Sequence, residues 1–397
     1  MRFTASIMSS LIQPLDRRSF AATVARHGAD AYDKTFTSWD HLIALIFAQL
    51  ASASSLRALE AAWNANAHCH YHLGAGPIAR STLADANARR PTAVFAETFD
   101  MLAPRLDRRA TREGRAMIEL IDSTPIPLPE LCAWAASNGR IFGLKMHVVY
   151  DVRADHPHRV EITPANVNDI EIGRKTALEA GATYVFDKAY CAYDWWREIH
   201  DCKAFFVTRP KANARFQILR ARPLDERERD GARANQSQDG GFVVLDDHDV
   251  ALASKGDSKL DMPLRLVRIA RDNGKELSIL SNDVASAARD IALLYKTRWQ
   301  IELLFRWLKQ HLKLTAFLGR SENAVRLQVL AAMIAFVLLR IAQRAHAIAM
   351  PALRFAELVG QHLFSRRLIA RIDKPPDVNP SKPKPKSAPG QLELRYA

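Results

Sequence analysis

The stretch Tyr295-Lys-Thr-Arg298-Trp-Gln-Ile-Glu302-Leu-Leu-Phe-Arg-Trp-Leu-Lys309 carries polar side chains at a spacing that predicts one edge of a helix. Tyr295, Arg298, Glu302 and Lys309 lie at offsets of 0, 3, 7 and 14, within an arc of about 60° on an α-helix. The adjoining arc is apolar, as in a packed amphipathic helix: Leu294, Ile301, Leu304, Phe305, Leu308 and Leu312. An edge with one acid, two cations and a phenol suits a phosphate backbone beside a metal ion.

These polar residues are also typical of an ordinary solvated helix face. Arg298 and Glu302 alone would then form an i,i+4 ion pair that contributes about a few tenths of a kcal/mol. The composition favours the first interpretation, because 56 Lys and Arg residues against 43 acids give a formal charge of +13. Such an excess suggests a polyanionic partner, either nucleic acid or an acidic membrane surface.

The size and the cysteines of the chain narrow its class. With 397 residues and 48% hydrophobic content, the chain can bury a large core and is expected to form two or more domains. Its four cysteines are scattered without a CxxC pair, so a reducing cytoplasm is the expected compartment. No convincing secretory signal is present, and the apolar run at 329–339 is too short to span a bilayer. We therefore expect no membrane association and a buried helix at that run.

The first part of the chain, residues 1–110, is expected to be an all-helical DNA-binding domain. Residues 18–105 are Ala-rich and nearly free of strand signals. A short helix from Ser81 to the proline at 91 ends with Arg89 and Arg90, which are candidates for contacts in a major groove. A small packing helix is an equally good interpretation of the same residues.

The pattern changes near residue 117, and residues 111–350 predict an α/β catalytic domain. Short β-prone runs and helices alternate to give a mixed sheet with helices on its faces. The expected strands are 117–121, 143–151, 159–163, 183–186 and 204–208, and the expected helices are 168–180 and a segment through Trp195-Trp196. Residues 209–281 are expected to form a β-rich insertion. The third segment, 351–397, is expected to hold a C-terminal helix and a disordered Pro/Lys-rich tail.

Two aspartates, Asp122 and Asp187, each follow a predicted strand. Side chains at the carboxyl ends of strands emerge from a rigid platform, although an aspartate there is also a common loop-capping residue. Together with Glu302, they supply the three carboxylates that two hard divalent cations about 3.5–4 Å apart require for phosphoryl transfer. No Walker A, GxGxxG or Ser-His-Asp arrangement competes with this interpretation.

With these residues, the chain resembles the DDE transposases of the insertion-sequence-4 group, bacterial enzymes with a Tyr-x2-Arg-x3-Glu-x6-Lys signature. Tyr295, Arg298, Glu302 and Lys309 match that spacing without a gap. Ile121-Asp122-Ser123-Thr124 resembles the block with the first catalytic aspartate of the family. Val185-Phe186-Asp187-Lys188-Ala189-Tyr190 resembles the block with the second. The likeness covers most of residues 15–350.

The resemblance implies a ribonuclease-H-like catalytic core, interrupted by the β-rich insertion, and a separate all-helical N-terminal domain. It implies that Asp122, Asp187 and Glu302 bind two Mg²⁺ or Mn²⁺ ions. The implied partners are double-stranded DNA, both terminal inverted repeats and target, and a second copy of the chain in a synaptic homodimer. Tyr295, Arg298 and Lys309 would contact phosphates near the element's end, in a bacterial, nucleoid-associated protein of the cytoplasm. The implied reaction is cut-and-paste transposition.

The chain departs from the family in two places. The family often has Gly two residues after the second aspartate, where this chain has Ala189. Relatives that form a DNA hairpin place in the insertion an aromatic residue that stacks on a flipped base. All seven tryptophans here lie outside 209–281, which leaves Phe216 and Phe242 as the aromatic candidates within the insertion. Trp195, Trp196 and Trp299 are alternatives outside it, with core packing as the other interpretation of each.

Two other functions remain open from the sequence. One is a catalytically inactive, transposase-derived DNA-binding protein. The other is a structure-specific nuclease that shares the core and lacks strand transfer. The presence of all three carboxylates disfavours the first, and only reaction products distinguish the second.

Overall fold

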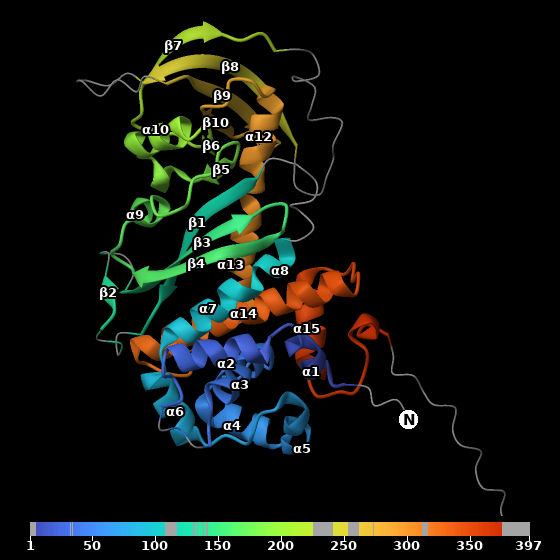
Figure 1. Ribbon diagram of the computed structural model, residues 1–397. Coiled ribbons are helices and arrows are strands. Elements are labelled where there is room, and N and C mark those ends of the chain that lie inside the picture. The colour runs from blue at the N-terminus through green and yellow to red at the C-terminus, as the bar shows by residue number, and fades with distance from the viewer. Residues whose placement is uncertain are drawn as a thin grey trace, which may run out of the picture.

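A computed structural model describes most of the chain (Figure 1). The described residues are 5–31, 33, 35–107, 117–129, 132, 134–137, 139, 142–224, 241–252, 262–272, 274–311 and 317–374. The expected disordered tail at 375–389 and the expected domain boundary at residue 110 lie outside these ranges. The domain boundaries therefore stay a prediction.

One mixed sheet of ten strands forms the centre of the described structure, in the order β2-β3-β1-β5-β6-β10-β9-β8-β7, with β4 paired to β3. Its first six strands are β1 (Ile118–Pro127), β2 (Ala136–Ser137), β3 (Phe142–Asp151), β4 (His156–Pro164), β5 (Thr183–Phe186) and β6 (Phe205–Thr208). Strands β1, β5 and β6 are parallel, and β3 and β4 are antiparallel to their neighbours. The order β4-β3-β1-β5-β6 is that of a ribonuclease-H-like core, which confirms the expected fold class.

The β-rich insertion continues this sheet. Its strands are β7 (Phe216–Ala221), β8 (Phe242–Leu252), β9 (Leu264–Arg271) and β10 (Glu276–Ser281). Strand β10 pairs with β6 through Leu280↔Thr208 and Ser281↔Val207, so the insertion is joined to the core by backbone hydrogen bonds. The described strands of the insertion therefore extend the core sheet.

The two faces of the sheet are covered by different layers. Side chains alternate along β1, so Leu120 joins the large core beneath the sheet and Ile121 faces the smaller core under α10 (Tyr193–Asp201). Aromatic rings dominate the smaller core: the Trp195 and Phe186 centroids are 5.0 Å apart, and those of Trp196 and Phe206 are 4.9 Å apart. The short helix α9 (Asp169–Gly173) lies on the same side.

The N-terminal part is helical, as expected, and begins with well-capped helices. Thr37 and Asp40 form a capping box at the start of α3 (Ser38–Leu50), which satisfies two backbone N–H groups there. The other α-helices described before β1 are α1 (Ile7–Ile12), α2 (Arg17–Arg26), α4 (Leu56–Asn64), α5 (Ala67–His70), α6 (Arg80–Arg89), α7 (Thr92–Leu102) and α8 (Pro104–Asp107).

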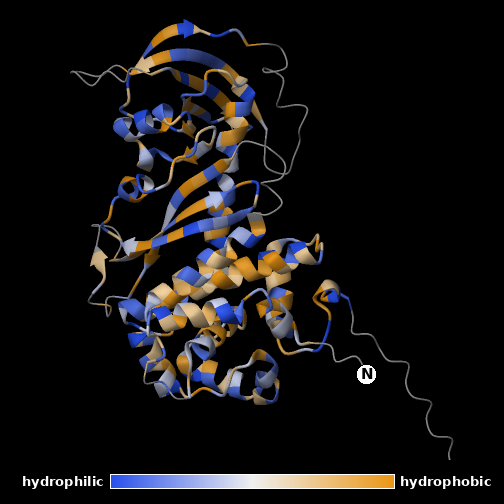
Figure 2. Cartoon of the chain, viewed as in Figure 1, coloured by the Kyte–Doolittle hydropathy of each residue, from blue (hydrophilic) through white to orange (hydrophobic). Residues whose placement is uncertain are grey.

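The long helix α14 (Glu322–Ala345) joins the N-terminal helices to the sheet. It contacts α3, α6 and α7 on one side and β4 on the other, and most of its ribbon has the orange colours of hydrophobic residues in Figure 2. It is long and apolar enough to cross a membrane, but 83% of its most apolar window is buried inside the protein. Helix α14 is thus a core helix, followed by α15 (Ala352–His362).

Three expected elements differ from the structure. Strand β1 continues through Asp122 to Pro127, because β3 pairs with it as far as Pro127↔Gly143. Helix α9 ends at Gly173 instead of continuing to residue 180, and glycine disfavours helix continuation by about 1 kcal/mol relative to alanine. The expected single helix at 295–309 is two helices, α12 (Ala288–Thr297) and α13 (Trp299–His311).

The break between α12 and α13 falls at Arg298. The N–H groups of Arg298 and Ile301 bond to carbonyls three residues back, at 3.1 and 3.3 Å, which is a 3₁₀ turn. The Thr297 hydroxyl also donates to the carbonyl of Leu294 at 2.6 Å. Hydroxyls that bond back to the helix backbone in this way bend helices. The polar edge, which the sequence predicts to lie on one straight helix, is therefore bent at Arg298.

Candidate active site

The two aspartates lie side by side on adjacent parallel strands. The ladder between β1 and β5 ends with the pair Ile121↔Phe186, and Asp122 and Asp187 are the next residues on each strand. Asp187 follows the end of β5, as predicted. Asp122 lies within β1, because β5 ends beside it while the pairing of β1 with β3 continues. Neighbouring strands are about 4.8 Å apart, so the two carboxylates share one place on the sheet.

Arg298 links Glu302 to this pair. Its Nη2 lies 2.6 Å from Glu302 Oε1 and its Nη1 lies 3.3 Å from Asp122 Oδ2. The glutamate of α13 therefore reaches the first aspartate through one guanidinium group. We call Asp122, Asp187 and Glu302 the acidic site.

Arg209 is part of this region and was not singled out from the sequence. Its Nη2 lies 3.3 Å from Asp187 Oδ1. Strands β5 and β6 pair through Val185↔Val207, and continuing that register by two residues places Arg209 opposite Asp187. The rule that pointed to the aspartates, a polar residue directly after a parallel strand, would have found Arg209 had it been applied to β6.

Electrostatics distinguish Asp122 within the acidic site. Burial raises the pKa of Asp122 to about 6, and the nearby charges of Asp187 and Glu302 raise it further, against the Ser123 N–H and Arg298, which lower it. A cation bound beside this carboxyl group would stabilise its ionised form and offset the repulsion among the three carboxylates.

The acidic site has the donor chemistry of a divalent-cation site. Carboxylate oxygens are the ligands that Mg²⁺ and Mn²⁺ prefer, and the Arg298 guanidinium already brings positive charge between two of the three groups. Among the described residues no set of three acidic, His or Cys side chains stands in metal-ligating geometry. The three residues fit the ion by the type of their donor atoms, and in this structure the Arg298 guanidinium lies between Asp122 and Glu302.

The remaining signature residues differ in accessibility. Tyr295 is 5% exposed. Burial raises the pKa of its hydroxyl, and the nearby Arg298 lowers that pKa in part. Lys309 is half-buried on α13, and burial lowers its pKa. No described contact joins Lys309 to the acidic site.

Arg89 and Arg90 have different environments at the end of α6. Arg89 is exposed. Arg90 is 4% exposed, and its guanidinium donates to Asp33 at 2.8 Å and to the Thr37 carbonyl at 2.6 Å. The expectation that Arg90 contacts DNA is therefore wrong for this structure, because its donors connect α6 to the segment before α3.

The three tryptophans considered for base stacking differ in solvent exposure. Trp195 and Trp196 are fully buried under the sheet, as their 0% and 1% exposure shows. Trp299 is 46% exposed, and Arg306 lies over its ring at 5.3 Å. Core packing thus accounts for the first two and not for Trp299.

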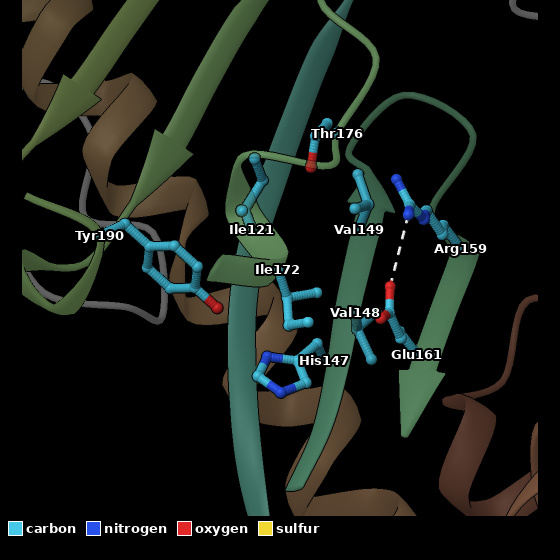
Figure 3. A pocket seen from close by; sticks show the side chains of 10 residues that line it. Ile121, His147, Val148, Val149, Arg159, Glu161, Ile172, Thr176 and Tyr190 are labelled. Atoms are coloured by element: carbon cyan, nitrogen blue, oxygen red, sulfur yellow. Dashed lines mark hydrogen bonds and ion pairs between the residues drawn. The ribbon is translucent and has the colours of Figure 1, made fainter. Parts of the chain in front are cut away.

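The opposite face of β1 is closed by a polar cluster and a small cavity. Ser123 Oγ donates to Asp169 Oδ1 at 2.8 Å, and Lys145 Nζ does so at 3.0 Å. A cavity of about 10 Å³ lies beside them, with Ile121, His147 and Tyr190 among its lining residues (Figure 3). It has room for about one water, and the polar cluster beside it supports the strand that carries Asp122.

The fold and the acidic site define a ribonuclease-H-like protein with clustered carboxylates, and comparison with known proteins specifies the family. A model described as a transposase DDE domain matches residues 114–338. A model described as a domain of unknown function matches residues 4–76. The chain belongs to the DDE transposase family.

Two relatives that are similar in sequence agree with this assignment. The chain is 58% identical over 314 residues to "Putative transposase y4zB" of Sinorhizobium fredii (strain NBRC 101917 / NGR234), covering 79% of this chain and 85% of that protein. It is 27% identical over 263 residues to "Probable transposase for insertion sequence element IS5377" of Geobacillus stearothermophilus, covering 66% of each. A solved piggyBac transposase synaptic complex with hairpin DNA aligns with a TM-score of 0.45 and 12% identity, over 99% of this chain and 88% of that one.

Membership carries a general chemistry. DDE transposases are polynucleotidyl transferases that act on DNA and generally use divalent metal ions. The basic composition of this chain, +13 at neutral pH, is consistent with a DNA partner.

Proposed function

We propose that this protein is a cut-and-paste transposase of the insertion-sequence-4 group, which cleaves DNA at terminal inverted repeats and joins the freed ends to target DNA. The observation that carries the proposal is the convergence of Asp122, Asp187 and Glu302. Two of them sit at adjacent positions on parallel strands, and Glu302 reaches Asp122 through Arg298.

The three carboxylates are the residues that would hold two Mg²⁺ or Mn²⁺ ions. When bound, the ions would activate the attacking water or 3′-hydroxyl and stabilise the leaving oxygen in an in-line displacement. Asp122 and Asp187 are fixed by the sheet, and Glu302 is carried by a helix that packs against β1. Each oxygen donor is thereby set on a rigid element.

Arginine and lysine side chains supply the phosphate contacts in this proposal. Arg298 offers a planar fork that suits a phosphate as well as the carboxylates it now contacts. Arg209 carries a second guanidinium on the other side of Asp187. Tyr295 and Lys309, on either side of Arg298 along the chain, complete the proposed contact set near the element's end, and exposed Arg89 is a further candidate. A homodimer that pairs two ends, in the bacterial cytoplasm, completes the proposal.

Carboxylate substitution tests this function directly. We expect Asp122→Asn, Asp187→Asn and Glu302→Gln each to reduce metal-dependent strand cleavage at least a thousandfold, because each removes a ligand charge, while binding of the same DNA persists. The substrate is DNA that spans both flanks of the coding region, and EDTA should abolish cleavage by the wild type. Near wild-type strand transfer by any variant would remove that residue from the acidic site.

The products also separate the alternatives. Cleaved ends joined to a target plasmid indicate a transposase. Hydrolysis alone would indicate a nuclease without strand transfer. Binding without any metal-dependent cleavage would indicate an inactive DNA-binding derivative.

A further inference from the structure

The turn at residues 283–286 links the β-rich insertion to the two helices, α12 and α13, that lead to Glu302 of the acidic site. It connects β10 to α12, which begins at Ala288. Helix α12 ends at Thr297, directly before Arg298, and α13 carries Glu302. A shift of this turn would move α12 along its axis and change where Arg298 and Glu302 meet Asp122.

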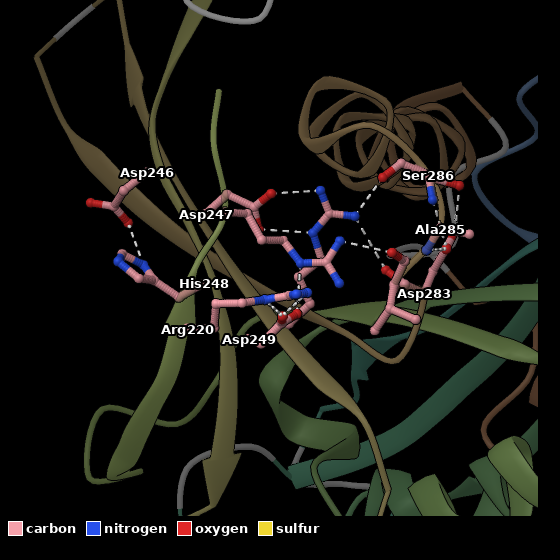
Figure 4. A network of polar contacts seen from close by, with 11 residues as sticks. Arg220, Asp246, Asp247, His248, Asp249, Asp283, Ala285 and Ser286 are labelled. Carbon is pink, nitrogen blue, oxygen red and sulfur yellow. Dashed lines mark hydrogen bonds and ion pairs between the residues drawn. The ribbon is translucent and has the colours of Figure 1, made fainter. Parts of the chain in front are cut away.

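Arg265 of β9 holds one side of the turn. Its Nε and Nη2 donate to the carboxylate of Asp247 on β8 at 2.8 and 2.6 Å. Its Nη1 donates to the carbonyl of Ser286 at 2.5 Å. Arg265 and Asp247 are both 3% exposed, so this fork is shielded from water. Figure 4 shows Asp247 on one side of the network and the turn on the other.

Arg222, directly after β7, holds the middle of the turn in the same way. Its Nε donates to Asp249 Oδ1 at 2.6 Å, and its Nη1 donates to the carbonyl of Val284 at 2.8 Å. Its own N–H donates to the carbonyl of Asp247 at 2.9 Å, which ties it to β8. Two arginines, each oriented by an aspartate of β8, therefore donate to the carbonyls of one short turn.

The turn is closed by its own side chains, so it moves as a unit. The Asp283 carboxylate accepts from the N–H groups of Ala285 and Ser286 at 2.9 and 3.0 Å. It also accepts from the Ser286 hydroxyl at 2.5 Å. The carbonyls of Val284 and Ser286 remain available to the arginines.

Two neighbouring arginines make similar ion pairs but do not reach the turn. Arg268 of β9 pairs with Asp246 of β8, and Arg220 of β7 pairs with Asp249. Their side chains are 46% and 70% exposed, and within the described part of the chain neither donates to residues 283–286. The chain therefore contains a matched control for each arginine that holds the turn.

We propose that Arg222 and Arg265 are positioning residues for Glu302, and that the β-rich insertion serves to fix the start of α12 relative to the acidic site. This inference rests on the proposed function, because it requires Glu302 to be a metal ligand whose position matters. A guanidinium that donates to a carboxylate and to a carbonyl at once has little freedom. Ligand geometry tolerates errors of only about 0.5 Å, so loosening of α12 lowers metal affinity before it unfolds the protein.

Mn²⁺ titration of the full-length protein, followed by electron paramagnetic resonance without DNA, tests the inference. Binding that disappears in Asp187→Asn defines the acidic site. We expect Arg222→Gln to weaken this binding at least fivefold and Arg220→Gln to change it less than twofold. Arg222→Lys, which keeps a donor, should recover part of the loss. The same comparison of Mn²⁺ affinity is repeated with Arg265→Gln and its control Arg268→Gln. If Arg265→Gln does not fold, the comparison of Arg222→Gln with Arg220→Gln decides the test.

Amide hydrogen exchange of α12 supplies a second readout. The inference expects faster exchange in Arg222→Gln than in Arg220→Gln, together with the loss of Mn²⁺ affinity. Faster exchange with unchanged Asp187-dependent affinity would overturn the positioning role and leave the acidic site standing. Absence of Asp187-dependent binding in the wild type would overturn the metal site of the proposed function, and this inference with it.

Discussion

Buried ionisable side chains in this protein differ in whether an opposite charge contacts them. Arg90 has Asp33 within 2.8 Å and two carbonyls as further acceptors. Glu119 is 4% exposed and stands opposite another acid, Asp151, on the neighbouring strand. Its near partner is His158, whose Nε2 lies 3.2 Å from Glu119 Oε1 and which carries charge only when protonated. The two residues therefore differ in their effect on stability, because Arg90 has a carboxylate partner and Glu119 has no permanently charged one.

Glu119 should make the protein less stable as the pH rises. Burial, aided by the charge of Asp151, raises the pKa of Glu119 to about 8. Because the folded-state pKa is above the unfolded one, the stabilising contribution is complete below about pH 4.5 and is lost as the pH rises toward 8. We expect Glu119→Gln, which mimics the protonated form, to gain roughly 3 kcal/mol over wild type between pH 5 and pH 8.

Urea unfolding at the two pH values measures this gain. The control is Glu161→Gln, whose carboxylate on β4 pairs with Lys175 at 2.8 Å. A difference between Glu119→Gln and wild type that stays constant with pH would show that Glu119 is ionised throughout.

Arg90 should be a stability residue and not a DNA contact. Removing it leaves Asp33 and the carbonyls of Phe36 and Thr37 without their donor, so Arg90→Gln is expected to lower the free energy of unfolding by about 3 kcal/mol. Arg89→Gln, at the exposed neighbouring position, should change it by less than about 0.5 kcal/mol. Thermal unfolding of the two variants checks the contrast, and equal effects would mean that the buried contacts contribute nothing.

At the scale of elements, the packing of the N-terminal helices against the C-terminal part depends on a close approach of α15 to α3. A Cβ atom at Gly360 would lie 2.5 Å from the carbonyl oxygen of Leu50 at the end of α3. The glycine therefore permits backbone-to-backbone contact between the two helices. The same scale explains why the 295–309 helix bends: a 3₁₀ turn at Arg298 turns its side chain toward both Asp122 and Glu302.

Gly360→Ala separates helix propensity from packing. Propensity alone would stabilise the helix by about 1 kcal/mol. We expect instead a loss of about 1–3 kcal/mol, because the new methyl group forces α15 away from α3. Denaturant unfolding measures the sign, with Glu357→Ala on the exposed face of α15 as the control. A stabilised Gly360→Ala protein would contradict the close approach.

At the scale of the whole molecule, α14 belongs to two layers at once. Its apolar side chains share one core with α3, α6 and α7. Its arginines bond to the sheet side: Arg326 donates to the Ile162 carbonyl at 2.7 Å, and Arg340 pairs with Asp155 in the turn between β3 and β4. The helical N-terminal part and the sheet are therefore coupled through a helix that comes late in the sequence.

This coupling predicts that the N-terminal helices do not fold alone. A fragment of residues 1–107 lacks the apolar face of α14, so its own apolar side chains would stay exposed to water. We expect no cooperative thermal transition in the circular dichroism of the fragment, whereas the full chain should unfold cooperatively. A fragment with a sharp transition of its own would show an independent domain.

The order of elements and the identity of the acidic residues were accessible from the sequence, because they depend on local signals. Alternating apolar runs marked the strands, and polar residues after those runs marked Asp122 and Asp187. The helical spacing marked Glu302 and Arg298. These signals need only the residues within one or two turns of the chain.

Long-range packing decided the rest. Only the pairing of β1 with β3 carries the strand past Asp122, and only the register of β5 with β6 brings Arg209 to Asp187. Arg90 is indistinguishable from Arg89 in sequence until the fold brings Asp33 and Thr37 into contact with it. The contacts of Arg222 and Arg265 with the turn at 283–286 join residues that are up to 62 positions apart. Such contacts depend on which surfaces the folded chain brings together, and no local pattern encodes them.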